Sequence, residues 1–391
     1  MTRNPVARIL AVMSTGLLLI VLAAACGSDP TSTPTTGPAQ GNTQEPTATP
    51  STPDFDAEAY FKGKTIQLVS ISPPGGGTDA QSRVLSALWG KFIPGNPRIS
   101  VSNIARVAGY NYMYNADPDG YTLMYKASPG FERQLAPDAE FKLNEFKLIV
   151  AVGVSPPIWV STSAVPYNTL SEAVGKTDFT FRFAEAVGAP IDLVGNPLTM
   201  TFLCDRLQLQ CEALAVADAG TDSQMLMFDR GEINSNLRGS LWWNLATLRP
   251  GAVGAGDYKG LTAAGNPNLG VPPHPETNVT IGHAYNLLTT EQDKDDFALT
   301  SYPAALFNKA LAAPPKTPDH IVAVFEQAFR DALADDEFAD TLSDVTSLDV
   351  RNDSVFRAEI EPVYLDTYDR FFGNQERYSE LQEELYTYWE R

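Results

Sequence analysis

Residues 65–92 read TIQLVSISPPGGGTDAQSRVLSALWGKF, and this stretch indicates a strand, a glycine-rich turn and a helix in succession. Residues 65–71 are rich in β-branched and other apolar side chains, which favours a strand. The helix is expected over residues 79–92, because its apolar side chains recur at helical spacing. These side chains are Val84, Leu85, Leu88 and Trp89. A strand that passes directly into a helix is typical of an α/β fold.

The turn at residues 72–79 is a candidate anion-binding site. Three consecutive glycines let the backbone approach a ligand closely, and the first turn of the helix presents N–H groups and the positive end of its dipole. The residues predicted to line the site are Ser72, Pro74, Gly75, Gly76, Gly77, Thr78 and Asp79. The alternative is a tight turn in which Thr78 or Asp79 only caps the helix.

A dinucleotide-binding interpretation of the same turn fails. Gly75, Gly77 and Ala80 match the pattern G-x-G-x-x-A, but two prolines precede the glycines and Asn103 lies where an acidic residue should close the second strand. No Gly-Lys-Ser/Thr follows, so the phosphate-loop pattern is absent as well.

The sequence offers no catalytic or metal-binding motif. Neither Gly-x-Ser-x-Gly nor His-Glu-x-x-His occurs, and the three histidines, His274, His283 and His320, lack metal-ligand spacing. We expect the histidines to be surface or capping residues. We therefore predict a protein that is not an enzyme and uses neither a cofactor nor a metal.

Strands and helices continue to alternate after this stretch, which predicts an α/β fold of mixed sheets flanked by helices. Further strands are expected at residues 99–104, 121–125, 148–153, 158–161, 179–183, 213–217, 233–237 and 258–264. Further helices are expected at residues 110–115, 191–207, 221–230, 241–248, 318–334 and along the tail 354–391. About 335 residues are more than one core usually serves, so we expect two lobes.

The N-terminus predicts a lipoprotein. Arg3 and Arg8 precede an apolar run at residues 9–22, and three alanines then lead to Cys26. This pattern predicts a signal peptide over residues 1–25 and diacylation of Cys26, with palmitate as a typical acyl chain. The alternative is an uncleaved N-terminal anchor. Residues 26–55 are mostly Ser, Thr, Pro and Gly, which is typical of a disordered linker.

The charge balance excludes some partners. Loss of Arg3 and Arg8 with the leader reduces the basic residues from 28 to 26 against 47 acidic ones, a net charge of −21. Such a surface avoids nucleic acid and anionic lipid. An anionic ligand would therefore need local donors, and Arg238, after a predicted strand, is one candidate counter-charge unless it is only a solvated loop arginine.

Two cysteines remain once Cys26 carries lipid. Cys204 and Cys211 form an even pair in an oxidising compartment, which is compatible with a disulfide. The alternative is two separately buried thiols.

Four segments together resemble a known receptor family. They are KTIQLVSISPPGGGTDAQSRVLSALW, NYMYNADPDGYTLMY, AGTDSQMLMFDRGEI and ALAAPPKTPDHIVAVFEQAFRDALADDEF, in consistent order over residues 61–350. The sequence resembles the substrate-binding receptors of tripartite tricarboxylate transporters, also called Bug-type receptors. The resemblance implies a Venus-flytrap fold whose two lobes close on a small carboxylate and deliver it to a membrane permease. We expect lobe one at residues 58–153 plus 284–391 and lobe two at residues 154–283.

The resemblance also implies further ligand-binding loops. In that family a loop of the second lobe acts with the first glycine loop, and here it falls at residues 184–192. The additional site residues it implies are Ser128, Glu185, Gly188, Ala189, Gly220, Thr221 and Asp222. Glu185 departs from the small or hydroxyl residues usual in that loop, and an acid there would repel a dicarboxylate or favour an amine.

The sequence therefore predicts a lipid-anchored extracytoplasmic receptor for a small solute, delivered to a transporter permease. Two alternatives remain open: a receptor that reports the closed state to a signalling partner, and an exported enzyme.

Overall fold

The computed structural model describes residues 55–75, 77–127, 130–217, 220–238, 241–268, 270–307, 309–346 and 348–390. The predicted signal peptide, Cys26 and nearly all of the predicted linker lie outside the described residues, as do Gly76 and Ser128.

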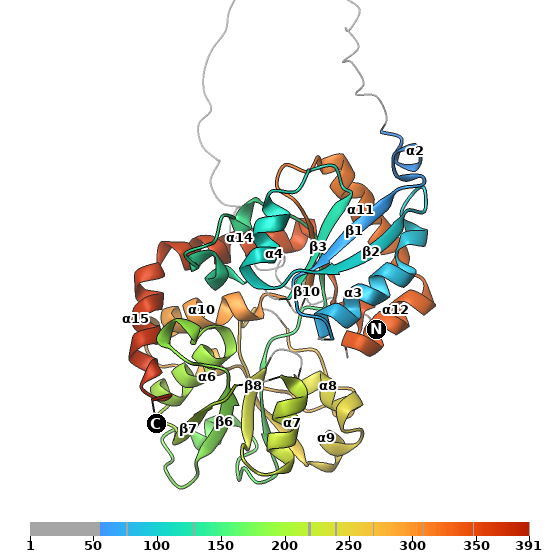
Figure 1. Ribbon diagram of the computed structural model, residues 1–391. Helices are drawn as coiled ribbons and strands as arrows, with labels where there is room; N and C mark the ends of the chain where they lie inside the picture. Colours follow the sequence, from blue (N-terminus) through green and yellow to red (C-terminus); the bar gives the residue numbers. More distant parts are fainter. Residues whose placement is uncertain are drawn as a thin grey trace, which may run out of the picture. The chain divides into compact units, whose positions relative to one another are not determined.

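A six-stranded sheet organises the first lobe, in the order β11-β4-β10-β3-β1-β2. Figure 1 shows β10, β3, β1 and β2 side by side. The strands are β1 (Thr65–Ser70), β2 (Arg98–Asn103), β3 (Thr122–Ala127), β4 (Lys147–Val152), β10 (Lys309–Ala313) and β11 (Val355–Phe356). β1 pairs in parallel with β2 and β3, whereas β10 runs antiparallel to β3 and β4. Ile66, Leu68 and Val69 of β1 are buried, because helices cover both faces of the sheet.

Helices pack against this sheet through apolar stripes. They are α2 (Ala57–Phe61), α3 (Gly77–Leu88), α4 (Arg106–Tyr114), α11 (Asp319–Leu333), α12 (Asp336–Thr346), α13 (Val350–Asp353) and α14 (Arg357–Gly373). Short 3-10 turns are η1 (Gly90–Phe92), η2 (Phe131–Leu135) and η3 (Leu143–Glu145). In α11 the buried residues Ile321, Val322 and Phe325 recur at helical spacing and face the sheet. The helix predicted at residues 318–334 is thereby confirmed.

The second lobe contains two smaller sheets. β5 (Ile158–Thr162) lies between β8 (Ser235–Arg238) and β9 (Tyr258–Ala263) and is antiparallel to both. β6 (Phe181–Glu185) pairs in parallel with β7 (Cys211–Ala215). The helices of this lobe are α5 (Leu170–Ala173), α6 (Gly195–Arg206), α7 (Thr221–Asp229), α8 (Leu241–Leu248) and α9 (Ala252–Ala255), with η4 (Pro190–Asp192) before α6. The molecule thus has a two-lobe α/β architecture. The exact residues that divide the lobes remain a prediction.

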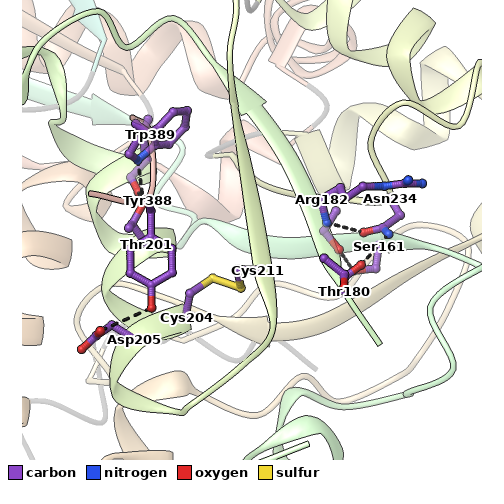
Figure 2. Close-up of a disulfide and its surroundings, with 12 residues drawn as sticks. Ser161, Thr180, Arg182, Thr201, Cys204, Asp205, Cys211, Asn234, Tyr388 and Trp389 are labelled. Atoms are coloured by element: carbon purple, nitrogen blue, oxygen red, sulfur yellow. Dashed lines mark hydrogen bonds between the residues drawn. A yellow bond between two sulfur atoms is a disulfide. The ribbon is translucent and has the colours of Figure 1, made fainter. Parts of the chain in front are cut away.

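The C-terminal helix fastens onto the second lobe. After η5 (Ala284–Leu287) and α10 (Glu291–Ala305), the chain ends in α15 (Gln375–Tyr386), which packs against α6 and η4. The indole N–H of Trp389 donates to Thr201 Oγ1 at 3.1 Å, and the Tyr388 hydroxyl donates to Asp205 Oδ1 at 3.3 Å (Figure 2). The tail is helical from Arg357 onward, as the sequence predicts, but residues 355–356 of the predicted helix form the strand β11. The tail ties the end of the chain to α6.

A disulfide lies at the C-terminal end of α6, next to the contact between Tyr388 and Asp205. Cys204 and Cys211 are joined, with their Cα atoms 6.1 Å apart (Figure 2). The bond links the last turn of α6 to the first residue of β7. It therefore closes a short loop beside the buried face of the second lobe.

Several elements are missing from the sequence predictions, among them α12, β10 and α10. β10 occupies a central position between β4 and β3, yet its sequence KALAA has no β-branched residue. Alanine favours helices, so the strand exists because both of its edges are paired and its side chains are buried. α10 is polar and contains Pro303 near its end, so its sequence gives a weak helical signal.

No helix in the described part of the chain is both long enough and apolar enough to span a bilayer.

Candidate functional site

The glycine-rich loop follows β1 at the edge of the sheet where the parallel strands β1, β2 and β3 all end. Ligands of open α/β sheets gather at this edge, because loops from neighbouring strands converge there. Ser72 is held by a 2.9 Å hydrogen bond between its hydroxyl and that of Ser70. Asn103, the last residue of β2, donates from Nδ2 to the Ser72 carbonyl at 3.3 Å.

Asp79 fixes the shape of this loop. Its carboxylate accepts from the Gly75 N–H at 2.9 Å, from Asn103 Nδ2 at 2.9 Å and from Arg83 Nε at 3.1 Å. The Gly75 N–H, more than any other group, holds the pKa of Asp79 below its ordinary value despite burial. Gly75 has a positive φ of 85°, which an L side chain rarely adopts. The structure thus gives Asp79 an internal bracing role.

The loop presents backbone outward. Pro74, Gly75 and Gly77 are exposed, whereas Thr78 and Asp79 are buried. The N–H groups of Gly77 and Thr78 belong to the first turn of α3 and have no acceptor within the helix. A Cβ atom at Gly77 would meet nothing within 4 Å. The exposed surface is therefore a set of backbone groups at a helix start with space in front of it.

A second group of predicted residues meets around Glu185, at the end of β6. Gln224 Nε2 donates to Glu185 Oε1 at 2.9 Å and to the Ala184 carbonyl at 3.0 Å. Arg238 Nη1 lies 3.9 Å from Glu185 Oε1. Burial raises the pKa of Glu185, and Arg238 and the Gln224 amide oppose that rise.

The start of α7 adjoins this group through Gln224. Gly220 is the N-cap residue of α7, and its carbonyl accepts from the Gln224 N–H at 3.0 Å. Thr221 and Asp222 follow in the first turn. The structure thus brings Glu185 together with the predicted loop at residues 220–222.

Gly188 and Ala189 have a different environment. The Gly188 N–H donates to Asp192 Oδ2 at 3.3 Å, and its carbonyl accepts from the Tyr386 hydroxyl at 3.0 Å. Ala189 is the N-cap residue of η4, and α6 starts only at Gly195, later than the predicted helix at residue 191. This loop therefore packs against α15, a contact between distant parts of the chain that no local pattern reveals.

Two lysines near the same edge of the first sheet are missing from the sequence predictions. Lys309 begins β10, and Lys126 lies on β3. Lys126 is buried, with Nζ 5.3 to 5.8 Å from the ring centres of Tyr110, Phe307 and Tyr364. Burial lowers the pKa of Lys126 to about 7. In the sequence, Lys126 and Lys309 each occur as one basic residue in a mostly apolar stretch. Such a pattern is a weak indication of a binding site.

His283 and His274 serve structural purposes. His283 Nδ1 accepts from the Tyr285 N–H at 3.4 Å and caps η5. His274 packs on Trp242, with ring centres 4.6 Å apart. Within the described residues no group of three or more His, Cys, Asp or Glu side chains is placed to hold a metal ion.

One surface hollow lies away from the glycine-rich loop. Its volume is about 680 Å³, and it is lined by the end of α4 and the turn before β3, including Tyr112, Asp117 and Asp119. This is the edge where β3 begins, opposite to the edge where β1 ends. We therefore do not place the solute site there.

Comparison with known proteins supports the fold. No protein-family model matches this sequence, and neither does any curated protein. A TctC solute-binding protein from Polaromonas superposes with a TM-score of 0.55 at 16% identity, over 81% of this chain and 99% of that one. MatC from Rhodopseudomonas palustris, solved with malate, gives 0.50 at 17% identity, over 82% and 100%.

A third structure, an R. palustris protein solved with adipate, gives a TM-score of 0.51 at 13% identity, over 82% of this chain and 98% of that one. The periplasmic binding protein BugD gives 0.51 at 16% identity, over 83% and 98%. These neighbours are solute-binding proteins rather than enzymes. The chain has the two-lobe fold of the TctC- and Bug-type solute-binding proteins.

Proposed function

We propose that this protein is a lipid-anchored, extracytoplasmic receptor that captures a small carboxylate-bearing solute and passes it to the permease of a tripartite tricarboxylate-type transporter. The observation that carries the proposal is the exposed glycine-rich loop at the end of β1, on a fold shared along nearly the whole length of TctC and MatC.

The chemistry of the loop suits an anion. A protein with a net charge of −19 along its full sequence repels acids at long range, so binding has to come from local donors. The first turn of α3 supplies N–H groups and the positive end of a helix dipole, at about 0.3 to 1 kcal/mol toward a charge. Malate and adipate are bound in two proteins of this fold, and both are small carboxylates.

The N-terminal sequence supports the location and the partner. An apolar leader followed by three alanines and Cys26 is typical of an exported lipoprotein, and a linker rich in Ser, Thr and Pro would hold the folded part away from the membrane. A receptor tethered next to the membrane is suited to hand its ligand to a permease in that membrane.

A ligand screen with a blocked loop tests the proposal. Thermal shift with lactate, malate, adipate, glutamate and citrate should reveal at least one stabilising acid, followed by calorimetry and small-angle scattering. Gly77→Glu places a negative side chain in the open space before α3. Loss of two or three backbone donors at about 1 to 3 kcal/mol each should weaken binding by about 30-fold or more.

Gly373→Glu is the matched control. Gly373 ends α14, is exposed, and a Cβ there also meets nothing within 4 Å. This variant should bind as the wild type does, and both variants should keep the wild-type melting transition without ligand. Equal affinity of Gly77→Glu and the wild type would place the ligand elsewhere, and failure of every acid would remove the carboxylate assignment.

A further inference from the structure

Arg238 and Lys309 come from different lobes and flank the segment that joins them. Lys309 is the first residue of β10 and lies opposite Val152, the last residue of β4. Arg238 is the last residue of β8 and lies opposite Ile158, the first residue of β5. Residues 153–157 connect β4 to β5. The two cations are therefore held at the two ends of one short crossover.

Their charges act on each other. Burial, and next to it the charge of Arg238, lowers the pKa of Lys309 to about 8. The neighbouring Lys126 pairs with Ala310, one position along β10, so its side chain belongs to the other face of the sheet. One acidic group near Arg238 is Glu185, whose Oε1 lies 3.9 Å from Arg238 Nη1; 16% of the Glu185 side chain is exposed, against 32% for Arg238. Two like charges at this crossover would both be stabilised by an anion between them.

A third polar group lies within the crossover. Ser155 is buried, and its hydroxyl has no hydrogen-bond partner in the part of the chain that the structure describes. A buried hydroxyl without a hydrogen-bond partner is costly, and a carboxylate oxygen nearby would accept a hydrogen bond from it. A guanidinium carries five N–H donors and can serve several acceptors, so pairing with Glu185 is compatible with a second carboxylate.

We propose that Arg238 and Lys309 are specificity-determining residues that hold a carboxylate of the solute at this crossover, one from each lobe. The proposal rests on the proposed solute-binding function and adds to it which side chains hold the carboxylate.

Charge-removing variants test the proposal with lactate, malate, adipate and glutamate as probes. Arg238→Met and Lys309→Met should each weaken binding of the wild-type ligand about 10- to 100-fold in calorimetry, as expected for a lost charged contact. Arg230→Met is the matched control, since Arg230 is an exposed arginine of the same lobe that pairs with Glu232 at 3.7 Å. It should bind as the wild type does.

The pH dependence provides a second readout. A bound acid requires Lys309 to be charged, so affinity should fall as the pH rises through about 8. Lys309→Arg should keep the affinity at pH 7 and lose this dependence. If both methionine variants keep the wild-type affinity while Gly77→Glu still blocks binding, Arg238 and Lys309 do not hold the carboxylate. The proposed receptor function would then still stand. If the wild type binds no acid in the panel, both proposals fail.

The proximity of Arg238 to Lys309 can be tested without ligand. Acetic anhydride labelling of Lys309, followed by mass spectrometry across pH, should give an apparent pKa of about 8 in the wild type. Arg238→Met should move it upward toward the ordinary value of 10.5, whereas Arg230→Met should not. If Lys309 titrates identically in Arg238→Met and in the wild type, the two cations do not face each other. That result would contradict the proposal that they hold one carboxylate together.

Discussion

Asp79 shows how one buried carboxylate organises a loop that was predicted to contact ligand directly. Its oxygens are occupied by Gly75, Asn103 and Arg83, so its negative charge is compensated before any solute arrives. Without such compensation an acid beside an anion site would oppose binding. Asp79 of the glycine-rich motif therefore stabilises the loop.

Asp79→Asn should destabilise the protein by about 1 to 3 kcal/mol at pH 7, because the Gly75 N–H and Arg83 lose a charged acceptor. Urea denaturation measures the change. The folded pKa of Asp79 lies below the ordinary 3.8, so its stabilisation is complete above that pH and is lost as the pH falls through the folded value. The difference in the free energy of unfolding between wild type and Asp79→Asn should therefore disappear in acid. Asp366→Asn, at an exposed position on α14, is the control and should change stability little. A stability difference between wild type and Asp79→Asn that stays the same in acid would contradict the charged role of Asp79.

Among the secondary-structure elements, α15 carries the largest unexpected role. It joins the end of the chain to α6 through Trp389 and Tyr388, and to the loop at Gly188 through Tyr386. Arg377 of α15 also pairs with the buried Asp296 of α10 at 2.7 Å. Three elements far apart in the sequence are thereby fastened together.

Trp389→Ala should cost about 3 to 5 kcal/mol, because the indole is buried and packs edge-on against Phe183 with ring centres 5.6 Å apart. Thermal and urea unfolding of the full chain measure the loss. Leu365→Ala removes an apolar side chain from an exposed face of α14 and should leave stability nearly unchanged. Equal, small effects of both substitutions would mean that α15 is not fastened to the second lobe.

The α6–β7 connection should be covalently closed in the mature protein. Alkylation without reductant should leave Cys204 and Cys211 unmodified, and alkylation after reduction in denaturant should modify both, as read by peptide mass mapping. Replacing both by alanine should cost roughly 2 kcal/mol, because the loop between them is short. Modification of both thiols in the unreduced protein would rule out the bond.

At the scale of the whole molecule, the proposed attachment to the membrane rests on Cys26, which lies outside the described residues. Cys26→Ser should abolish incorporation of labelled palmitate and release the protein into the aqueous fraction, because a single thiol is the acylation point. The variant should still bind its solute, since residues 57–391 form a compact unit separate from the N-terminal segment. Continued labelling of the serine variant would show that the lipoprotein interpretation is wrong.

The sequence by itself determined the α/β class, the strand–loop–helix at residues 65–88 and the helices α7, α8 and α11. In each case the signal is local: periodicity, glycine and proline positions, and helix starts follow from neighbouring residues. The glycine-rich loop could be recognised for the same reason, because its chemistry resides in its own backbone.

The tertiary structure alone decided the rest. β10 became a central strand because pairing and burial on both sides outweigh the helical preference of alanine. Glu185 met Gln224 and Arg238 because α7 and β8 pack against the end of β6. Arg238 and Lys309 came to flank one crossover because strand register joins residues that are tens of positions apart. Register depends on which strands pair, and pairing is settled by the packed core of the whole chain rather than by any local stretch of it.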